Sequence, residues 1–516
     1  MIKIKMSQTN QESSMFSFMK ENGYIWETQL SGHLTYGPFG KKLKTNLENF
    51  LRRVFERDGF EEIETPLISS RDLWEKTTHW TKFQDFVVEF QIKDKKGNKK
   101  GIKKHKVEEV LEWLEYNPLE YDLKLSEEHH SRIKEILSKN LEKLNQHYGG
   151  EPILPEKFTS ISLMMKSVSG NQDVGLRPET ASSTFANYFE YLNHYKQQFP
   201  IKIYQIGKSF RNEANSHSYL LRSREFTQGE FQFIYEAKNR KEVPKTLSQL
   251  KADSLDLMVQ VDDQKLLFWD LELQTEYLRL YLFLTLKLFH DLGIPSDRIR
   301  LHRHSEADRA FYALEAYDVE VKLSRYGWTE IAGVHDRGSY DLSVIFEKEL
   351  AKKKKKGLVP NVIEVAIGID RLFYSLVDSW YQKKDKGEGK TILQIPYQLA
   401  PVQVAILPLV KNKDPQLVQI AHDLETSLSR FWRVKYNDKS SIGNRYLRNA
   451  MMGIPYSVTV DFDSIPNQDV TVRDRDTEDQ IRVPISDLKE CLESLFSGNK
   501  TMNDFTKVNL KKEIKE

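Results

Sequence analysis

Two runs of β-branched and aromatic residues, at 201–210 and 221–234, constrain the fold of this 516-residue chain more than any other stretch. The polar segment 214–219 separates them, so the pair predicts an antiparallel hairpin with an extended connecting loop. Similar strand-like runs follow and are expected to continue the sheet; they lie at 298–302, 317–323 and 327–333. Residues 272–292 form a strongly apolar stretch that ends at a glycine and a nearby proline, which predicts a helix.

Charged residues mark the two runs of the hairpin. Arg211 and Glu213 lie two residues apart at the end of the first run, so they are expected on one face. Arg222, Arg224 and Glu230 share a parity on the second run, which predicts a common face for them as well. Arginines beside carboxylates on a sheet make a rigid site for a polyphosphate and a second, cationic group. The alternative is a set of solvent-exposed cross-strand ion pairs.

The order of these residues resembles a known motif. The string RNE at 211–213, a loop, and RSREF at 222–226 resemble the second signature motif of class II aminoacyl-tRNA synthetases. RPETA at 177–181 narrows the resemblance to glycyl-tRNA synthetases of the homodimeric type. The resemblance covers about 16–90 and 158–490. It implies an α+β class II core, an antiparallel sheet with flanking helices, followed by a C-terminal α/β anticodon-binding domain.

The first and third signature motifs have counterparts too. Apolar residues at helical spacing predict an amphipathic helix over 41–57, and 60–67 is expected to be a strand ending at a proline. This unit resembles the first motif, which builds the dimer interface, so a homodimer is expected. PNVIEVAIGIDRLFY at 360–374 resembles the third motif, in which Gly368 lets the backbone approach ATP and Arg371 points from a helix start.

The resemblance assigns roles in ATP binding. Arg211 would contact the α-phosphate, Arg222 and Arg371 the γ-phosphate, Glu213 the adenine amino group, and Phe226 the adenine face. Arg211 and Arg371 would be the catalytic residues, since the chemistry needs positioning and charge neutralisation. Glu330, in GWTEIAG, would hold the Mg²⁺ that accompanies ATP, because carboxylate oxygen suits this ion. The full set implied for ATP is Arg211, Asn212, Glu213, Arg222, Phe226, Thr227, Glu330, Ile331 and Arg371.

The amino-acid pocket follows from the same resemblance. An ammonium group attracts carboxylates, and the family converges three of them on glycine, here Glu179, Glu230 and Glu364. Buried carboxylates need cations nearby, so they belong beside arginines and a bound ammonium. The full set implied for glycine is Glu179, Gln228, Glu230, Arg337, Glu364 and Ala366. Walls that exclude a methyl group would give selectivity, and no editing domain is expected.

Two departures from the family pattern concern this pocket. VIEPS is VIEVA here, with Val365 and Ala366, and RPETAQG is RPETASS. The missing hydroxyl at 366 removes one hydrogen bond to glycine, worth roughly 1 kcal/mol. Position 366 is therefore either a tolerated variant or a sign of altered amino-acid selectivity.

Composition changes along the chain predict its division. Residues 1–15 are expected to be disordered, 16–392 to form the catalytic domain, 393–495 the anticodon-binding domain, and 496–516 a polar tail. A helical insertion is expected at about 91–157. Its basic run 93–106 predicts an exposed loop, and 107–116 and 126–147 predict two helices. The basic run is a candidate contact for the tRNA acceptor stem. The insertion contains no cysteine, so no structural zinc is expected.

The C-terminal part alternates strands and helices. Strands are expected at 402–409, 433–436, 457–461 and 470–473, and a helix at 417–430. Gly443 is expected to open a helix with Arg445 and Arg448 on a basic face. Such a face suits a single-stranded anticodon loop, although a basic surface helix without that role has the same composition.

Bulk composition limits the remaining possibilities. A net charge of +2 does not itself demand a polyanionic partner, and one cysteine, Cys491, excludes an internal disulfide. The sequence has neither an apolar run near ~18 residues nor a signal-peptide core, so no membrane span and a cytoplasmic location are expected.

The resemblance implies ATP, glycine and glycine tRNA as substrates of a ligase that works without a protein nucleophile. Two rivals stay open. One is a sister synthetase for serine, threonine or proline, because DLWEKTTHW at 72–80 is somewhat threonyl-like. The other is a synthetase-like protein that binds tRNA or nucleotide without charging it, which degenerate motif arginines would mark.

Overall fold

The computed structural model describes residues 15–506, except 31, 94–98, 108–109, 112–113, 115, 117–126, 149–150, 155–158, 214–218, 307–308, 311, 353–358, 384–390 and 411–413. The disorder predicted for 1–15 therefore falls almost entirely outside the described residues, as does the end of the predicted C-terminal tail. Within the described residues, no helix combines the length and the apolar character needed to cross a membrane.

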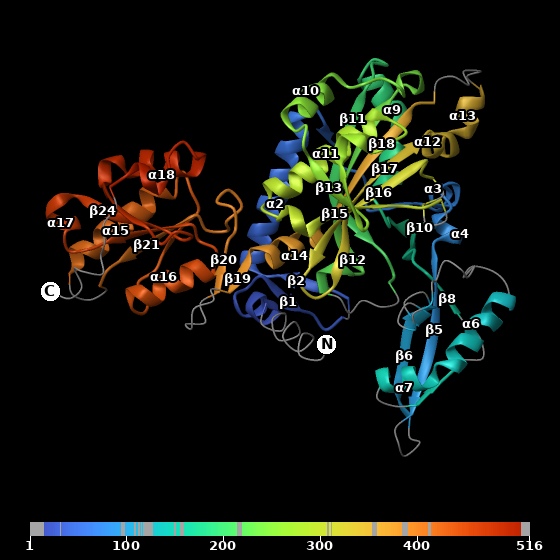
Figure 1. Ribbon diagram of the computed structural model, residues 1–516, viewed down its shortest axis with the longest axis horizontal. Coiled ribbons are helices and arrows are strands. Elements are labelled where there is room, and N and C mark those ends of the chain that lie inside the picture. Colours follow the sequence, from blue (N-terminus) through green and yellow to red (C-terminus); the bar gives the residue numbers. More distant parts are fainter. Residues whose placement is uncertain are drawn as a thin grey trace.

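A nine-stranded sheet forms the centre of the molecule, in the order β14-β13-β15-β16-β17-β18-β12-β11-β3 (Figure 1). Its pairs are antiparallel except β3 with β11 and β13 with β15. The strands are β3 (Glu61–Glu62), β11 (Ile201–Phe210), β12 (Glu225–Tyr235), β13 (Met258–Val261), β14 (Gln264–Leu267), β15 (Ile299–Arg303), β16 (Glu315–Leu323), β17 (Gly327–Gly338) and β18 (Asn361–Gly368). The predicted antiparallel hairpin is confirmed, with Ile201 opposite Ile234 and Phe210 opposite Glu225.

Three long helices are among those that contact this sheet or pack into the core that it shares. They are α2 (Pro38–Arg57), α11 (Glu276–Asp291) and α14 (Ile369–Trp380). Pro38 suits the first turn of α2 because the first helical N–H groups have no partner within the helix. Its buried face carries Leu43, Leu47 and Leu51, at the spacing that predicted the helix. The helices predicted at 41–57 and 272–292 are confirmed.

The strand predicted at 60–67 is largely wrong. Glu61 and Glu62 alone pair with β11, and the chain then leaves the sheet before Pro66. Proline has no N–H to donate to a ladder, which limits its use inside a sheet. The chain continues into β4 (Ile68–Ser70), which pairs with β10 (Gln172–Leu176) in a separate three-stranded sheet completed by β9 (Lys166–Ser169).

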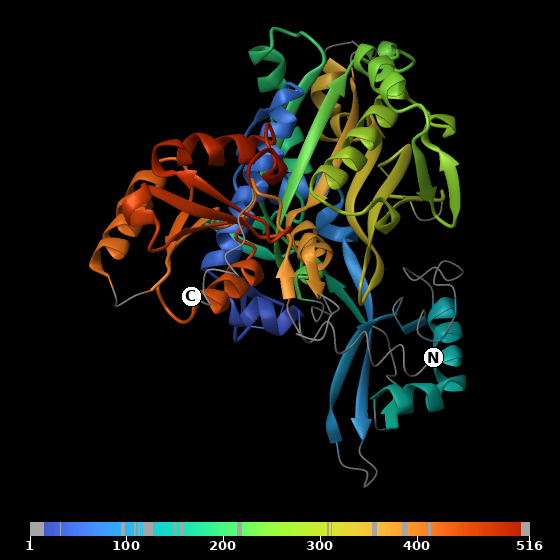
Figure 2. The same cartoon turned by 60° about the vertical axis from the view of Figure 1, so that its left-hand side comes forward.

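The insertion folds around its own apolar cluster and projects from the core in both views (Figures 1 and 2). Its elements are β5 (Gln84–Lys93), β6 (Lys99–Lys106), α6 (Glu127–Lys139), α7 (Leu141–Tyr148), β7 (Glu151–Ile153) and β8 (Thr159–Ser162). The exposed loop predicted at 93–106 is wrong, because most of this run is the strand β6, paired with β5. The single helix predicted at 126–147 is instead two, and half of 107–116 lies outside the described residues.

The C-terminal part is a five-stranded sheet with its own apolar cluster, ordered β22-β21-β23-β24-β25. Its elements are β21 (Val404–Pro408), α15 (Pro415–Leu428), β22 (Val434–Tyr436), α16 (Ile442–Met451), β23 (Tyr456–Val460), β24 (Asp469–Asp474), β25 (Gln480–Pro484) and α18 (Leu488–Ser497). The predicted alternation of strands and helices is confirmed. Asn46 of α2 donates to the carbonyls of Leu399 and Ala400, at 2.8 and 3.3 Å, and so links this part to the core.

Of the two arginines predicted on a basic face of α16, only one is exposed. Arg448 is exposed, but Arg445 is buried and donates to the carbonyls of Pro408 and Leu409, at 2.7 and 3.0 Å. Arg445 therefore anchors α16 to the end of β21 and is not available to a partner at the surface.

Candidate active site

A cavity of about 110 Å³ opens where β12, β17 and β18 meet the start of α14. All the residues predicted to bind ATP line it except Asn212, whose side chain donates to the carbonyl of Ser162 at 3.2 Å. Gln228 and Ala366, predicted for glycine, also line it. The complete lining is Arg211, Glu213, Leu220, Leu221, Arg222, Ser223, Phe226, Thr227, Gln228, Glu330, Ile331, Ala366, Gly368, Asp370 and Arg371.

Arg211 follows the last residue of β11 and is fixed at the mouth of the pocket. Its Nε donates to the carbonyl of Pro178 at 3.0 Å, and its guanidinium lies 5.4 Å from the centre of the Phe226 ring. Phe226 is therefore beside the arginine at the start of β12, as a stacking partner for a base would be. Arg211 joins the hairpin to the segment that carries Glu179.

Arg222 and Arg224 differ from the prediction because β12 begins at Glu225. Both arginines lie in the segment that leads into the strand, so a parity shared with Glu230 does not place them on its face. Arg222 Nε lies 3.3 Å from Glu213 Oε2, and Arg224 Nε donates to the carbonyl of Glu213 at 3.1 Å. The two arginines thus hold Glu213, one through its carboxylate and one through its backbone.

Arg371 and Glu330 form an ion pair across the cavity. Arg371 Nη1 lies 2.8 Å from Glu330 Oε2 and also donates to the Glu330 carbonyl at 3.0 Å. The positive charge of Arg371 lowers the pKa of the Glu330 carboxyl, so this side chain is ionised at neutral pH. Both side chains keep substantial exposure, at 34% and 51%, so the pair can be exchanged for ligand contacts.

A buried network beneath the cavity was not predicted. Lys44 Nζ of α2 lies 2.5 Å from Asp370 Oδ1 and 2.6 Å from Thr227 Oγ1. Asp370 also accepts hydrogen bonds from the Thr227 backbone and the Tyr36 hydroxyl, at 2.6 and 2.5 Å. The network joins α2, β12 and α14, which are the elements of the three motifs. Thr227 therefore lines the cavity while its side-chain hydroxyl is hydrogen-bonded to Lys44.

The predicted glycine residues meet at a second, buried cluster. Arg337 Nη1 lies 2.9 Å from Glu364 Oε1, and Arg337 also makes a bidentate pair with Asp341, at 2.8 and 2.7 Å. Gln232 donates to the other oxygen of Glu364 at 2.6 Å. Burial opposes ionisation of Glu364, yet Arg337 and the adjoining donors lower its pKa to about 2. Glu364 is thus a charged, fully paired carboxylate.

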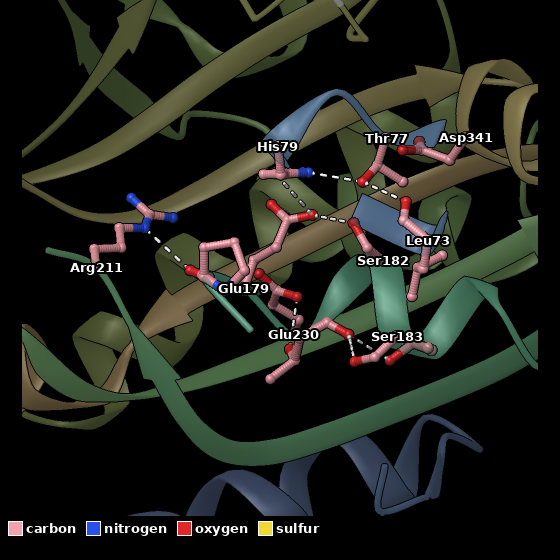
Figure 3. A network of polar contacts seen from close by, with 12 residues as sticks. Leu73, Thr77, His79, Glu179, Ser182, Ser183, Arg211, Glu230 and Asp341 are labelled. Atoms are coloured by element: carbon pink, nitrogen blue, oxygen red, sulfur yellow. Dashed lines mark hydrogen bonds and ion pairs between the residues drawn. The ribbon is translucent and has the colours of Figure 1, made fainter. Parts of the chain in front are cut away.

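Glu179 is the second carboxylate of the cluster (Figure 3). Its Oε1 accepts from Ser182 Oγ at 2.7 Å and lies 3.7 Å from His79 Nε2. Burial alone would raise the pKa of Glu179, but His79 and Arg337 lower it below its usual value. Burial lowers the pKa of His79 itself, so the imidazole is neutral near pH 7.

Glu230 differs from the other two carboxylates. It is 3% exposed and accepts a hydrogen bond from Thr180 Oγ1 at 2.6 Å, but within the described part of the chain it forms no ion pair. Burial, with the negative charges of Glu364 and Glu179, raises the pKa of Glu230 well above its usual value. This carboxyl is the place in the cluster where a cation would be bound.

Aromatic residues that sequence reasoning missed close this cluster. The Arg337 guanidinium lies 3.8 Å from the centre of the Tyr312 ring. Tyr312 and His79 line a small void of about 10 Å³ with Arg337 and Asp341. His79 belongs to the segment 72–80, which is somewhat threonyl-like. Nothing in the sequence indicated that His79 or Tyr312 would lie near the carboxylates of the buried cluster.

Family models match two long stretches of the chain. The tRNA synthetase class II core domain (G, H, P, S and T) matches 165–380, and the anticodon-binding domain matches 403–495. The glycine–tRNA ligase of Pyrococcus abyssi is 30% identical over 93% of this chain and 98% of the relative. That of Mycoplasmopsis synoviae is 27% identical over 94% of this chain and 99% of the relative.

A solved structure shares the fold. Prolyl-tRNA synthetase from Cryptosporidium parvum, complexed with L-proline and AMP, superposes with a TM-score of 0.56 over 94% of this chain and 75% of that chain. At 14% identity this likeness concerns the fold alone, whereas the relatives matched over nearly their full length are glycine enzymes. The predicted class II core and C-terminal anticodon-binding domain are confirmed, and the chain belongs to the glycine–tRNA ligase family of class II aminoacyl-tRNA synthetases.

Proposed function

We propose that this protein activates glycine with ATP and transfers it to the 3′ end of glycine tRNA. A carboxylate oxygen of glycine attacks the α-phosphorus of ATP, the bond to pyrophosphate breaks, and glycyl-adenylate forms. A ribose hydroxyl at the tRNA 3′ end then attacks the acyl carbon, and AMP leaves. The observation that carries the proposal is the buried carboxyl of Glu230, which forms no ion pair with any described residue and lies next to an arginine-lined cavity.

The phosphates of ATP would be bound by Arg211, Arg222 and Arg371. Guanidinium groups bind phosphate oxygens bidentately and neutralise the charge that accumulates as pyrophosphate leaves. In the free protein Arg222 and Arg371 are paired with Glu213 and Glu330. Phosphate binding would exchange these pairs, which frees Glu213 for the adenine amino group.

Mg²⁺ with ATP is part of the proposal, and the residues present fit it. Among the described residues, no group of three or more His, Cys, Asp or Glu side chains could hold a metal ion. Mg²⁺ is commonly held by one or two carboxylates together with substrate phosphates, which is what Glu330 beside the cavity provides. When bound, the ion neutralises phosphate charge.

Glycine would lie with its ammonium beside Glu230 and its carboxylate toward Arg211. Glu364 is already paired with Arg337, and Glu179 accepts a hydrogen bond from Ser182, so both would surround the ammonium together with Glu230. Tyr312 and His79 close the cluster with rigid rings. A side chain larger than hydrogen would have to displace these rings.

The C-terminal part would bind the anticodon. A cavity of about 480 Å³ lies between α16 and the sheet, lined by Tyr446 and Arg473 among others. The Arg473 guanidinium lies 4.8 Å from the centre of the Tyr446 ring. A half-buried aromatic ring beside an arginine in a cavity suits an unstacked base of a single-stranded loop.

We further infer that the protein is a homodimer and acts in the cytoplasm. Apolar side chains remain exposed on and beside the three-stranded sheet of β4, β9 and β10: Leu67 at 43%, Ile68 at 42% and Val168 at 64%. A second copy would cover them. Sedimentation equilibrium tests this inference, and a monomer at micromolar concentration would contradict it. The domain boundary predicted between 392 and 393 and the insertion predicted at about 91–157 remain part of the proposal.

The first experiment is ATP–pyrophosphate exchange with glycine, alanine, serine or threonine. Exchange with glycine is expected, and exchange with another amino acid in its place would assign a sister specificity. Arg211→Ala should lower exchange by about 10²–10³-fold, the usual loss for one charge-stabilising donor. Full activity of that variant would remove Arg211 from the site, and absence of exchange with every amino acid would leave a protein that binds without charging.

A further inference from the structure

We infer that Lys106 of the insertion is a positioning residue for Glu213, so that the insertion takes part in adenine recognition. This inference rests on the proposed role of Glu213. Lys106 Nζ lies 3.4 Å from Glu213 Oε2 and 2.7 Å from Asp85 Oδ2. All three side chains are 12% exposed. The group lies where the insertion meets the hairpin, at the end of β6.

The contacts of Glu213 explain why a second cation matters. Its backbone N–H donates to the Arg211 carbonyl at 2.8 Å, which fixes the backbone and leaves the side chain to be oriented by charge. Both Lys106 and Arg222 approach the same oxygen, Oε2, and that oxygen is buried without accepting a direct hydrogen bond. The other oxygen, Oε1, is thereby left for a donor such as the adenine amino group.

Arg222 cannot stay paired with Glu213 throughout the reaction. In the proposed function it moves to the γ-phosphate, which removes one of the two cations from Oε2. Lys106 then remains on Glu213, held by Asp85 as its second partner. The carboxylate stays oriented while the phosphates are bound, because one cation still lies beside Oε2.

The position of Lys106 makes this arrangement rigid. It is the last residue of β6 and lies opposite Val87 of β5, while Asp85 lies two residues earlier on β5, opposite Ile161 of β8. Lysine and aspartate therefore come from neighbouring strands of one sheet. The insertion delivers the ammonium as a fixed charge and not as a flexible surface side chain.

The test compares ATP with purine riboside 5′-triphosphate, which lacks the 6-amino group. Lys106→Met should raise the KM for ATP about tenfold in glycine-dependent exchange and leave kcat nearly unchanged. The same variant should raise the KM for purine riboside triphosphate less than about twofold. Lys106→Arg should keep the preference for ATP, and Lys139→Ala, which removes an exposed insertion lysine paired with Glu135, should change neither KM.

The variant Glu213→Ala tests the proposed adenine role of Glu213 separately from the inferred role of Lys106. If Glu213→Ala does not reduce the preference for ATP over the purine analogue, the adenine role of Glu213 is wrong. If it does, Lys106→Met should have no further effect on that preference in the Glu213→Ala background. An equal loss of affinity for both nucleotides in Lys106→Met would overturn the inference.

Two further variants cover indirect effects. Asp85→Asn combined with Lys106→Met removes the carboxylate that the single variant leaves unpaired, and it should still lose the preference for ATP. If Lys106→Met does not fold, as judged by thermal unfolding, Lys106→Arg decides. Loss of discrimination in that folded, charge-conserving variant would contradict positioning by charge.

Discussion

Glycine binding should release a proton from Glu230, and Glu230→Gln should abolish this release. The pKa of Glu230 lies well above its usual value in the free protein, owing to burial and to Glu364 and Glu179. Below that raised pKa the free protein holds the proton. An ammonium beside the carboxyl favours the ionised form and lowers its pKa, so the proton leaves as glycine binds.

The sign and size of the effect follow from linkage. With one proton released, glycine affinity should rise about tenfold for each pH unit between the bound and free pKa values. This window ends at the raised pKa of the free protein, which lies well above the ordinary carboxyl value of 4.5. Glu179 and Glu364 have lowered pKa values and are already ionised, and His79 is already neutral, so none of them supplies the proton.

Isothermal titration calorimetry in phosphate and in Tris at about pH 7 measures the release, because the observed enthalpy depends on buffer ionisation in proportion to the protons released. Glu230→Gln keeps the size of the side chain and its bond to Thr180, so it serves as the matched control and should bind glycine more weakly. Equal enthalpies in both buffers for the wild type, or undiminished release from the variant, would refute the reasoning.

Three further outcomes are expected. Ala366→Ser should lower the KM for glycine about fivefold, the effect of one hydrogen bond of about 1 kcal/mol, with the KM for ATP unchanged in exchange assays. Glu230→Gln should raise Tm by a few degrees at about pH 8 and not at about pH 5, because a pKa raised on folding gives stability that is lost as pH rises through it. Gly207→Ala should cost about 1–3 kcal/mol in chemical unfolding, since its Cβ would lie 2.2 Å from Nη2 of buried Arg177. Gly443→Ala, which meets no atom within 4 Å, is the neutral control.

The periodicity of apolar residues predicted the fold well where the buried side chains of a segment recur at the spacing of one kind of secondary structure. The residues of β11 match the predicted run, because its side chains pack into an apolar cluster on each face of the sheet, and the apolar stripe of α2 predicted its helix. The sequence failed at β6, where six of the eight residues are lysine or histidine and hid a strand whose place is set by pairing with β5. A strand specified by its partner leaves no alternating apolar signal of its own.

Polar residues with structural tasks were equally hidden. Arg445 and Asn449 occupy the buried positions of α16, so the inner face of this helix is polar and hydrogen-bonded. Composition alone suggested that Arg445 was exposed. Lys44 and Asp370 form a pair although they lie 326 positions apart in the sequence. From the sequence alone, a lysine buried in an apolar stripe cannot be distinguished from one that extends its charged end to solvent. Motif resemblance named the cavity residues, but it did not show which of them are already paired.

That distinction separates the two substrates. In the ATP cavity, Arg371 is paired with Glu330 and Arg222 with Glu213. ATP therefore replaces existing pairs, and the exchange favours phosphate because it carries more charge and accepts bidentate bonds. In the buried pocket, Glu230 forms no ion pair within the described part of the chain, so the ammonium of glycine takes the place of its proton and displaces no paired side chain. The protein thus holds its phosphate-binding arginines in place before ATP arrives, while the ammonium of glycine completes the charge balance around Glu230.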